Sequence, residues 1–333
     1  MQKFLIIQTA FVGDVVLATG LIEKLHFHFP DAQIDFLLRK GNEGLLLNHP
    51  FLHDVLIWDK KKGKYSELWK MANRIRKNKY DKVINVQRFA ATGFLTIFSG
   101  AKQKIGFDKN PFRFGFDVKV PHPISKDSNP IHEIQRNLDL VKHFTDNTLY
   151  RPRLYPSHSD DELVSKYKTS KYICIAPASV WFTKQFHPDK WISFIKKLPS
   201  DLRIYLLGAP GEKELCENIL QQSAHANAQN LAGTLSFLQS ASLMKDAAMN
   251  YVNDSAPMHF ASAMNAAVTA VYCSTIPAFG FGPLSDQSFI VEIEEKLYCR
   301  PCGLHGYKAC PEGHFRCALD IRDEQLLRTL ENS

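Results

Sequence analysis

Several signatures of common protein classes are missing from this chain of 333 residues. It has no run of 18 or more apolar residues, so we expect no membrane-spanning helix. The opening MQKFLIIQTAFVGD reaches Asp14 too soon for a secretory signal, so we expect a cytoplasmic protein. None of its seven cysteines precedes Cys174, and the chain is too long for a small disulfide-stabilised scaffold.

The familiar nucleotide and metal motifs are also missing. Without G-x-G-x-x-G or G-x-x-x-x-G-K-[ST], the sequence lacks the signals of a dinucleotide-binding Rossmann domain and of a P-loop NTPase. No Asp-x-Asp pair follows a predicted strand, where it would hold a divalent metal across a diphosphate. We therefore expect catalysis without a bound metal.

What the sequence has is an uneven charge. Residues 1–150 hold 23 Lys and Arg against 15 Asp and Glu, whereas residues 151–333 hold 18 against 19. Between Lys60 and Arg113 the count is 15 against 3. This excess indicates an anionic partner, which would be nucleic acid, a phospholipid surface or a phosphorylated substrate; a solvated basic face is the plain alternative.

Short β-rich runs alternate with helical patterns through both halves, which predicts two doubly wound α/β domains with mainly parallel sheets. The expected strands are Lys3–Gln8, Gln33–Leu38, Asp54–Trp58, Asp81–Gln87, Tyr172–Ala176, Arg203–Leu207, Met249–Val252, Val268–Tyr272 and Phe289–Ile293. The expected helices are Asp14–Phe29, Lys64–Asn78, Ile131–Phe144, Asp320–Leu330 and four that start near Asp189, Glu212, Leu235 and Pro257. The proline-bearing segment Arg151–Pro156 predicts a linker.

Ligands of open α/β sheets bind beyond the carboxyl ends of the strands, so the loops after strands are the candidate sites. Asp14 follows the first strand, either as a functional carboxylate or as a cap of the next helix. Ser179, Thr183 and Lys184 lie in a long loop that suits a phosphate or diphosphate; an exposed loop with a surface lysine is the alternative. Glu212 follows a tight turn, where a ribose contact competes with a plain helix start.

The segment Val252–Ala263 (VNDSAPMHFASA) is the most informative loop. Pro257 suits the first turn of a helix, which places Asp254 and Ser255 at the helix N-terminus. Amides and a hydroxyl suit a phosphate, and a carboxylate suits sugar hydroxyls. His259 lies one turn further on, as a ligand contact or a core histidine.

Five segments in this order resemble the bacterial heptosyltransferases of glycosyltransferase family 9, which build the lipopolysaccharide inner core. They are LIIQTAFVGDVVLATGLIEKL, IAPAS…TKQFHPDKW, LAGTLSFLQSASLM, YVNDSAPMHFASAM and CRPCGLHGYKACPEGHFRC. The resemblance implies the GT-B fold, with two facing Rossmann-like domains. Residues 1–150 would bind the acceptor, 151–170 would be the linker, 171–317 would bind the donor, and 318–333 would form a helix crossing back to the first domain.

By resemblance, Asp14 matches the catalytic base of an inverting, metal-independent transfer of heptose from ADP-heptose. The implied donor-binding residues are Ser179, Thr183, Lys184, Glu212, Gly233, Thr234, Asp254, Ser255, Ala256 and His259. Glycine is common in the family where this chain has Ala256. Two alternatives stay open, a related glycosyltransferase with another nucleotide sugar, and a non-enzymatic protein that binds anions or nucleic acid.

The resemblance also gives the basic segment a partner, an anionic lipid-linked oligosaccharide at the inner membrane. We expect Lys60, Lys61, Lys62 and Lys64 to bind that acceptor, with peripheral membrane contact and no nucleic acid. The closing cysteines Cys299, Cys302, Cys310 and Cys317 are expected to be reduced thiols packed around the tail, with a structural zinc site as the lesser alternative.

Overall fold

The computed structural model describes residues 1–124 and 130–331, apart from the side chain of Lys64. The chain divides into two compact units, and the boundary between them falls between Tyr155 and Pro156. This boundary lies inside the segment 151–170 that was expected to be the linker. We call the two parts the N-terminal unit and the C-terminal unit.

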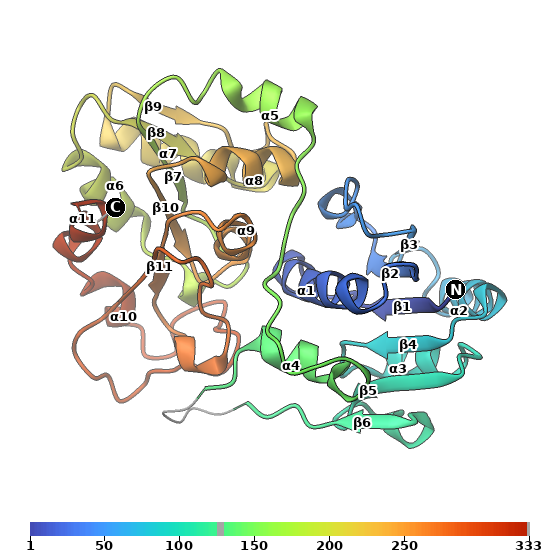
Figure 1. Ribbon diagram of the computed structural model, residues 1–333. Coiled ribbons are helices and arrows are strands. Elements are labelled where there is room, and N and C mark those ends of the chain that lie inside the picture. The colour runs from blue at the N-terminus through green and yellow to red at the C-terminus, as the bar shows by residue number, and fades with distance from the viewer. Residues whose placement is uncertain (125–129, 332–333) are drawn as a thin grey trace. The chain divides into compact units, whose positions relative to one another are not determined.

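The N-terminal unit is a six-stranded parallel sheet in the order β3-β2-β1-β4-β5-β6 (Figure 1). Its elements, with η for a short 3-10 turn, are β1 (Lys3–Ile7), α1 (Val12–His28), β2 (Gln33–Arg39), η1 (Glu43–Leu45), β3 (Asp54–Trp58), α2 (Lys64–Asn78), β4 (Lys82–Asn85), α3 (Ala90–Ile97), β5 (Gln103–Phe107), η2 (Arg113–Gly115), β6 (Val118–Val120), α4 (Glu133–Asp139) and η3 (Lys142–Phe144).

Both faces of this sheet are covered. Successive side chains of a strand point to opposite faces, so neighbouring residues of β1 pack into different cores. Leu5 and Ile7 of β1 pack into the core that α2 and α3 close. Phe4 points the other way and packs edge-on against Phe29, which follows α1, with ring centroids 5.3 Å apart. A strand buried on both faces reads as the unbroken apolar run seen at β1.

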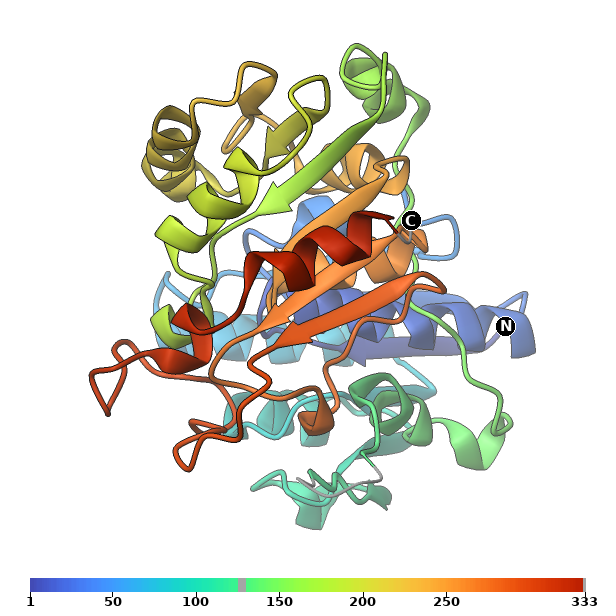
Figure 2. The ribbon, with the colours of Figure 1, turned by 90° about the vertical axis from the view of Figure 1, so that its left-hand side faces the viewer.

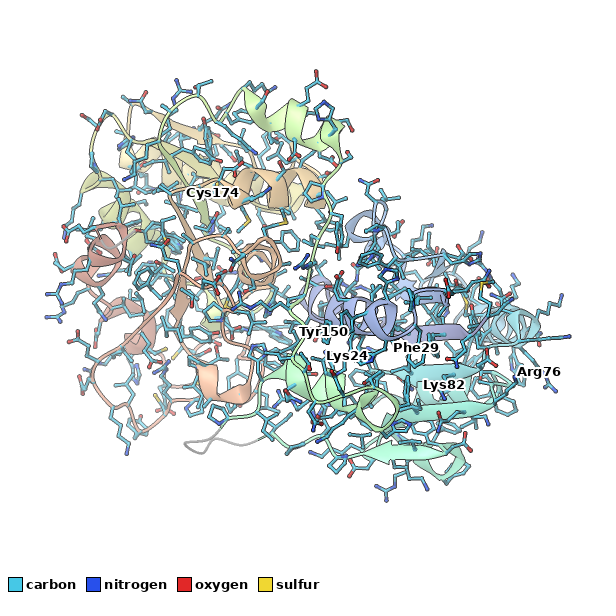
Figure 3. The ribbon with its side chains drawn as sticks, viewed as in Figure 1. Lys24, Phe29, Arg76, Lys82, Tyr150 and Cys174 are labelled. Atoms are coloured by element: carbon cyan, nitrogen blue, oxygen red, sulfur yellow. The ribbon has the colours of Figure 1, made fainter. Side chains whose placement is uncertain are left out.

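Buried Lys24 fastens the end of the N-terminal unit to α1. Its ammonium donates to the carbonyls of Asp146 and Thr148 and forms an ion pair with the Asp146 carboxylate at 3.0 Å. The same ammonium lies 5.5 Å from the ring centre of Tyr150, and Figure 3 shows the two side chains next to each other. These contacts hold the segment that leads to the second unit.

The C-terminal unit is a second six-stranded parallel sheet, in the order β12-β11-β10-β7-β8-β9 (Figure 2). Its elements are α5 (His158–Ser165), β7 (Tyr172–Ala176), η4 (Phe182–Lys184), α6 (Pro188–Lys196), β8 (Arg203–Leu206), η5 (Pro210–Glu212), α7 (Lys213–Ser223), β9 (Ala228–Asn230), α8 (Phe237–Lys245), β10 (Met249–Asn253), α9 (Ala256–Met264), β11 (Val268–Tyr272), η6 (Pro277–Phe279), β12 (Ser288–Glu292), α10 (Arg316–Leu319) and α11 (Asp323–Glu331).

The C-terminal helix α11, which was expected to cross back to the first domain, packs on the core of the C-terminal unit. Figure 2 shows it lying over the strands of the second sheet. Leu326 is fully buried in that core, and Thr329 donates a hydrogen bond to Tyr251 of β10. Asp323 accepts from Ser193 and pairs with Lys197 at 2.9 Å, both near α6. The helix buries its apolar face here, which fixes its place.

The predicted alternation of strands and helices is confirmed, but it missed the strands β5, β6 and β9 and the helices α3, α5 and α10. β6 and β9 have three residues each, too few to show a period. The segment of α3 contains Gly93, a weak helix former, which is required there because a Cβ would lie 2.1 Å from the side-chain oxygen of Asn110. The expected helix Ile131–Phe144 is split, since α4 ends at Asp139 and η3 begins at Lys142.

Each sheet has a switch point, where the order of strands reverses direction. In the N-terminal unit it lies between β1 and β4, and in the C-terminal unit between β7 and β10. Ligands of doubly wound sheets bind outside the carboxyl ends of the strands at this point. The loops after β1, β4, β7 and β10 are therefore the places to look for chemistry. No helix in the described parts of the chain is long and apolar enough to span a membrane.

Candidate functional site

Asn253, the last residue of β10, fixes the switch point of the C-terminal unit. Its side chain is fully buried and donates to the carbonyl of Pro177 at 2.7 Å. Its side-chain oxygen accepts from the backbone amide of Phe186 at 2.8 Å. One amide thus holds both ends of the loop between β7 and α6, and with it the lysine that the loop carries.

That lysine, Lys184, forms an ion pair with Asp254, which follows β10. The Nζ of Lys184 lies 2.7 Å from Oδ2 of Asp254, and the two side chains are 16% and 9% exposed. Thr275 donates to the same carboxylate oxygen at 2.6 Å. The structure thus brings together two residues that the sequence singled out separately. A lysine ammonium has three donors, so one carboxylate leaves it able to bind a phosphate as well.

Helix α9 begins beside this ion pair. Ser255 is its N-cap, but its side chain makes no capping hydrogen bond and instead donates to the carbonyl of Asn253 at 3.4 Å. Pro257 occupies the first turn. The first amides of a helix lack intrahelical partners and attract anions, so a half-buried turn at Ser255 and Ala256 suits a phosphate. His259, one turn inside the helix, is 5% exposed.

Thr183 is only 1% exposed, and its hydrogen bonds join the loop after β7 to the segment around Tyr307. We call this set of hydrogen bonds the clamp. The amide of Tyr307 donates to its hydroxyl oxygen at 2.7 Å, and the hydroxyl of Ser274 does so at 3.0 Å. The amide of Thr183 donates in turn to the carbonyl of Tyr307 at 3.1 Å. This burial argues against the expected direct phosphate contact of the Thr183 hydroxyl.

Gly306 makes the clamp possible. It has φ +75°, and a Cβ there would lie 2.9 Å from Oγ1 of Thr183 and 3.0 Å from Cγ of Lys184. The segment before α10 therefore packs directly on the residue that carries the cation. Sequence reasoning missed Gly306 and Tyr307, because the contact joins segments more than 120 residues apart. Thr275 could have been found, since it follows the predicted strand Val268–Tyr272.

The remaining residues expected at the donor lie in loops of the same sheet. Ser179 is half-buried, and its carbonyl accepts from Gln185 at 2.6 Å. The Glu212 carboxylate accepts from the amide of Ala209 at 2.7 Å, as a helix-start residue does. The loops after β8 and β9 meet where the amide of Gly233 donates to Gly208 at 2.8 Å.

Thr234 follows Gly233 directly, and its hydroxyl donates to the carbonyl of Leu231 at 2.7 Å. Gly233 has φ +75°, and a Cβ there would come within 2.8 Å of Pro210. Glycine is therefore required for the two loops to approach, which places Glu212 and Gly233–Thr234 in one neighbourhood.

In the N-terminal unit, Asp14 lies in the first turn of α1, just beyond β1. The helix begins at Val12, and the half-buried Asp14 accepts from the amide of Phe11 at 3.1 Å. This bond orients the carboxylate at the carboxyl end of the sheet. Across the switch point, the hydroxyl of Thr9 donates to Gln87, which follows β4, at 2.6 Å.

Lys60, one of the lysines expected to meet an acceptor, contacts the loop at this switch point. Its ammonium donates to the carbonyl of Thr9 at 2.9 Å and lies 5.0 Å from the ring centre of Trp58. Burial of the ammonium, together with the nearby Arg39, lowers the pKa of Lys60 to about 8. Lys61 and Lys62 are exposed. The side chain of Lys64 lies outside the described residues.

The closing cysteines are thiols. The Sγ of Cys299 lies 3.9 Å from Nε2 of His314, and Cys317 is buried. Burial, with the neighbouring thiols, raises the pKa of Cys317 to about 12, which keeps it protonated. Across the residues that the structure describes, no three His, Cys, Asp or Glu side chains converge in a way that would hold a metal ion.

Known proteins are similar to this chain in both sequence and fold. Residues 68–307 match the family model of glycosyltransferase family 9 (heptosyltransferase). Lipopolysaccharide heptosyltransferase 2 of Escherichia coli K12 is 23% identical over 352 aligned residues, covering 99% of this chain and 97% of its own.

Two solved structures agree over nearly the full length. The E. coli ADP-heptose lps heptosyltransferase II has a TM-score of 0.79 at 21% identity, covering 100% of this chain and 98% of its own. An E. coli heptosyltransferase solved with ADP-2-deoxy-2-fluoro heptose has a TM-score of 0.74 at 17% identity, with 99% of each chain covered. The expected GT-B class is thereby confirmed as the fold. With the family model matching well over half of its length, the chain belongs to glycosyltransferase family 9, the heptosyltransferases.

Proposed function

We propose that this glycosyltransferase moves a heptose from ADP-heptose to an inner-core acceptor of lipopolysaccharide, with inversion at the anomeric carbon. The observation that carries the proposal is the ion pair of Lys184 and Asp254 at the N-terminus of α9, at a sheet switch point. Relatives whose names specify ADP-heptose and lipopolysaccharide support this donor and this acceptor. The C-terminal unit would bind the donor, and the N-terminal unit the acceptor.

Lys184 and the first turn of α9 would hold the donor diphosphate. Negative charge grows on the diphosphate as the glycosidic bond breaks, and fixed donors aimed at growing charge lower the barrier most. In this arrangement Asp254 orients the ammonium and offers its carboxylate to the sugar hydroxyls. Thr183 acts as a positioning residue, because its hydrogen bonds to Tyr307 and Ser274 fix the loop next to Lys184.

Ser179, Ala256 and His259 would complete the contacts to the donor phosphates and sugar, and Glu212 with Gly233 and Thr234 would receive the nucleoside. The half-buried Ser179 and the first-turn Ala256 lie in the loops that follow β7 and β10. Glu212 and Gly233–Thr234 share one neighbourhood after β8 and β9.

Asp14 would act as the general base. It takes the proton from an acceptor hydroxyl while that oxygen forms its bond to the anomeric carbon. The bond between this carbon and the diphosphate oxygen breaks, and ADP leaves with the electron pair. Such base assistance contributes about 10²–10⁴-fold, and positioning supplies much of the remainder.

Lys60, Lys61, Lys62 and Lys64 would attract the anionic acceptor at the carboxyl end of the first sheet. The contact of Lys60 with the Thr9 carbonyl ties this charge to the loop that leads to Asp14. An acceptor anchored in a membrane implies action at the inner membrane surface, with the enzyme bound peripherally.

A transfer assay tests the proposal. The enzyme is given ADP-heptose and a deacylated inner-core oligosaccharide, ADP release is followed, and the product linkage is read by NMR. We expect ADP release with an inverted anomeric configuration. Retention of configuration, or transfer from UDP- or GDP-sugars alone, would contradict the proposal.

The same assay tests whether the transfer requires a bound metal. We expect full activity after exhaustive chelation, because the cationic side chain of Lys184 and the α9 amides stabilise the leaving diphosphate. Loss of activity that only a metal restores would overturn this part of the proposal.

A further inference from the structure

A connected set of aromatic rings lies on α2 and α3 and in the loop that follows β5. Trp69 of α2 packs against Phe94 of α3 and against Phe98, which directly follows α3, with ring centroids 5.0 and 5.7 Å apart. Phe94 in turn contacts Phe112, at 6.4 Å, and Phe112 contacts Phe114, at 5.9 Å. We call these five residues the aromatic surface.

The aromatic surface is open to solvent although it is held by the core. Trp69 is 52% exposed, Phe98 39% and Phe114 74%. Phe94 anchors the group, because it also packs against the buried core under α2 and α3. Single exposed apolar residues are ordinary, but several in contact mark an interaction site.

Exposed cations lie on the same segments of the chain as these rings. Arg113 stands in sequence between Phe112 and Phe114 and is exposed. The side chain of Arg76 lies over Gly100 just after α3, where a Cβ would be 3.4 Å from its Cγ, and Figure 3 shows Arg76 at the outer side of α2. Lys77 beside it is exposed. All of them belong to the segment Lys60–Arg113, which has 15 basic against 3 acidic residues.

We propose that the aromatic surface docks the enzyme on an anionic phospholipid bilayer. Tryptophan and phenylalanine rings settle at the boundary of headgroups and acyl chains, and nearby arginines and lysines bind the lipid phosphates. The proposed function explains why such docking is useful, since a lipid-linked acceptor lies in a membrane. The surface itself follows from the side chains alone.

Charge and ring geometry favour lipid over the other occupants. A second copy of this chain would bring one strongly basic segment against another, which repels. Single-stranded nucleic acid needs open ring faces on which bases stack. Here Trp69 and Phe94 meet edge to face, with an interplanar angle of 84°, so the contact covers a ring face on which a base would stack.

Vesicle co-sedimentation of the full chain tests the proposal. One set of vesicles contains phosphatidylglycerol, and the other only phosphatidylcholine. We expect binding to the anionic vesicles, weakening with added salt, and a loss of at least about tenfold in the double variant Trp69→Ser, Phe114→Ser. The matched control is Phe27→Ser, an aromatic residue of the same unit that is 69% exposed on α1, and it should bind as the wild type does.

Activity assays separate this proposal from the proposed function. The double variant should keep its turnover on a deacylated, water-soluble acceptor and lose turnover on an acceptor embedded in vesicles. Absence of vesicle binding, equal binding by the double variant, or a solution dimer that the two substitutions dissociate would each overturn the docking surface. Stronger binding to nucleic acid than to anionic vesicles would do so too.

Discussion

The two units share one topology and differ in the side chains at their switch points. Each is a six-stranded parallel sheet whose switch point is tied by a buried amide side chain, Gln87 in the N-terminal unit and Asn253 in the C-terminal unit. At the second switch point a cation and a carboxylate pair directly, Lys184 with Asp254. At the first, the carboxylate of Asp14 accepts from a backbone amide. The topology determines where a site lies, and the side chains determine what it does.

In the proposed function the base lies in one unit and the leaving-group site in the other, and the largest expected effect tests the base. Asp14→Asn removes the proton acceptor and keeps the shape, so we expect kcat to fall by about 10²–10⁴-fold. ADP affinity should stay unchanged, because the proposed donor site belongs to the other unit. Steady-state kinetics and calorimetry check both. A parallel loss of ADP binding would show that the division of roles is wrong.

The next effect separates the sugar from the diphosphate within the C-terminal unit. Asp254→Asn removes the negative charge that faces Lys184 and replaces one of the two carboxylate oxygens proposed to accept from sugar hydroxyls. We expect the donor KM to rise about 10- to 100-fold while ADP binds as well as before or better, since the lysine loses its competing carboxylate. Asp246→Asn, at an exposed ion pair with Lys168, is the matched control. Equal losses for ADP and ADP-heptose would contradict a sugar contact.

Removing the hydrogen bonds of Thr183, next to Lys184, should have a smaller effect. Thr183→Val leaves the amide of Tyr307 and the hydroxyl of Ser274 without their acceptor, a cost of about 1–3 kcal/mol in unfolding free energy. We expect the donor KM to rise about tenfold, through the loop that carries Lys184. Thr183→Ser keeps the hydroxyl and should restore the donor KM. If Ser fails to rescue while both variants stay folded by circular dichroism, the positioning role is wrong.

The smallest expected effect is the dependence of the acceptor KM on pH. The Lys60 ammonium, with its pKa of about 8, is charged below that pH and loses its charge above it. Attraction of an anionic acceptor should therefore weaken as pH rises, with the acceptor KM increasing about threefold between about pH 7 and 9. Lys60→Gln should remove this dependence, and Lys62→Gln should keep it. An unaltered pH profile in Lys60→Gln would contradict the contact.

The sequence predicts the repeating architecture well and the site in part. Continuous apolar strands such as Tyr172–Ala176, buried at every position, announce themselves by composition. Residues that follow strands, such as Lys184 and Asp254, are found by the rule that loops at carboxyl ends carry ligands. Their direct pairing is not in the sequence, because it depends on how β7 and β10 lie side by side.

Contacts between distant segments explain what the sequence did not predict. The amide of Tyr307 that grips Thr183 is 124 positions away, so Thr183 reads as an exposed hydroxyl in the sequence and is buried in the fold. The destination of α11 is likewise set by tertiary packing, since Leu326 finds its partners in the second sheet. An amphipathic helix shows which face it buries and not where it docks.

Calorimetry of ADP, UDP and GDP with the wild type and Lys184→Ala tests the central claim most directly, with Lys196→Ala, an exposed lysine at the end of α6, as the control. The account predicts selective binding of ADP, weakened by at least about tenfold in Lys184→Ala and unchanged in Lys196→Ala. Preference for UDP or GDP, or ADP binding that ignores Lys184, would contradict it.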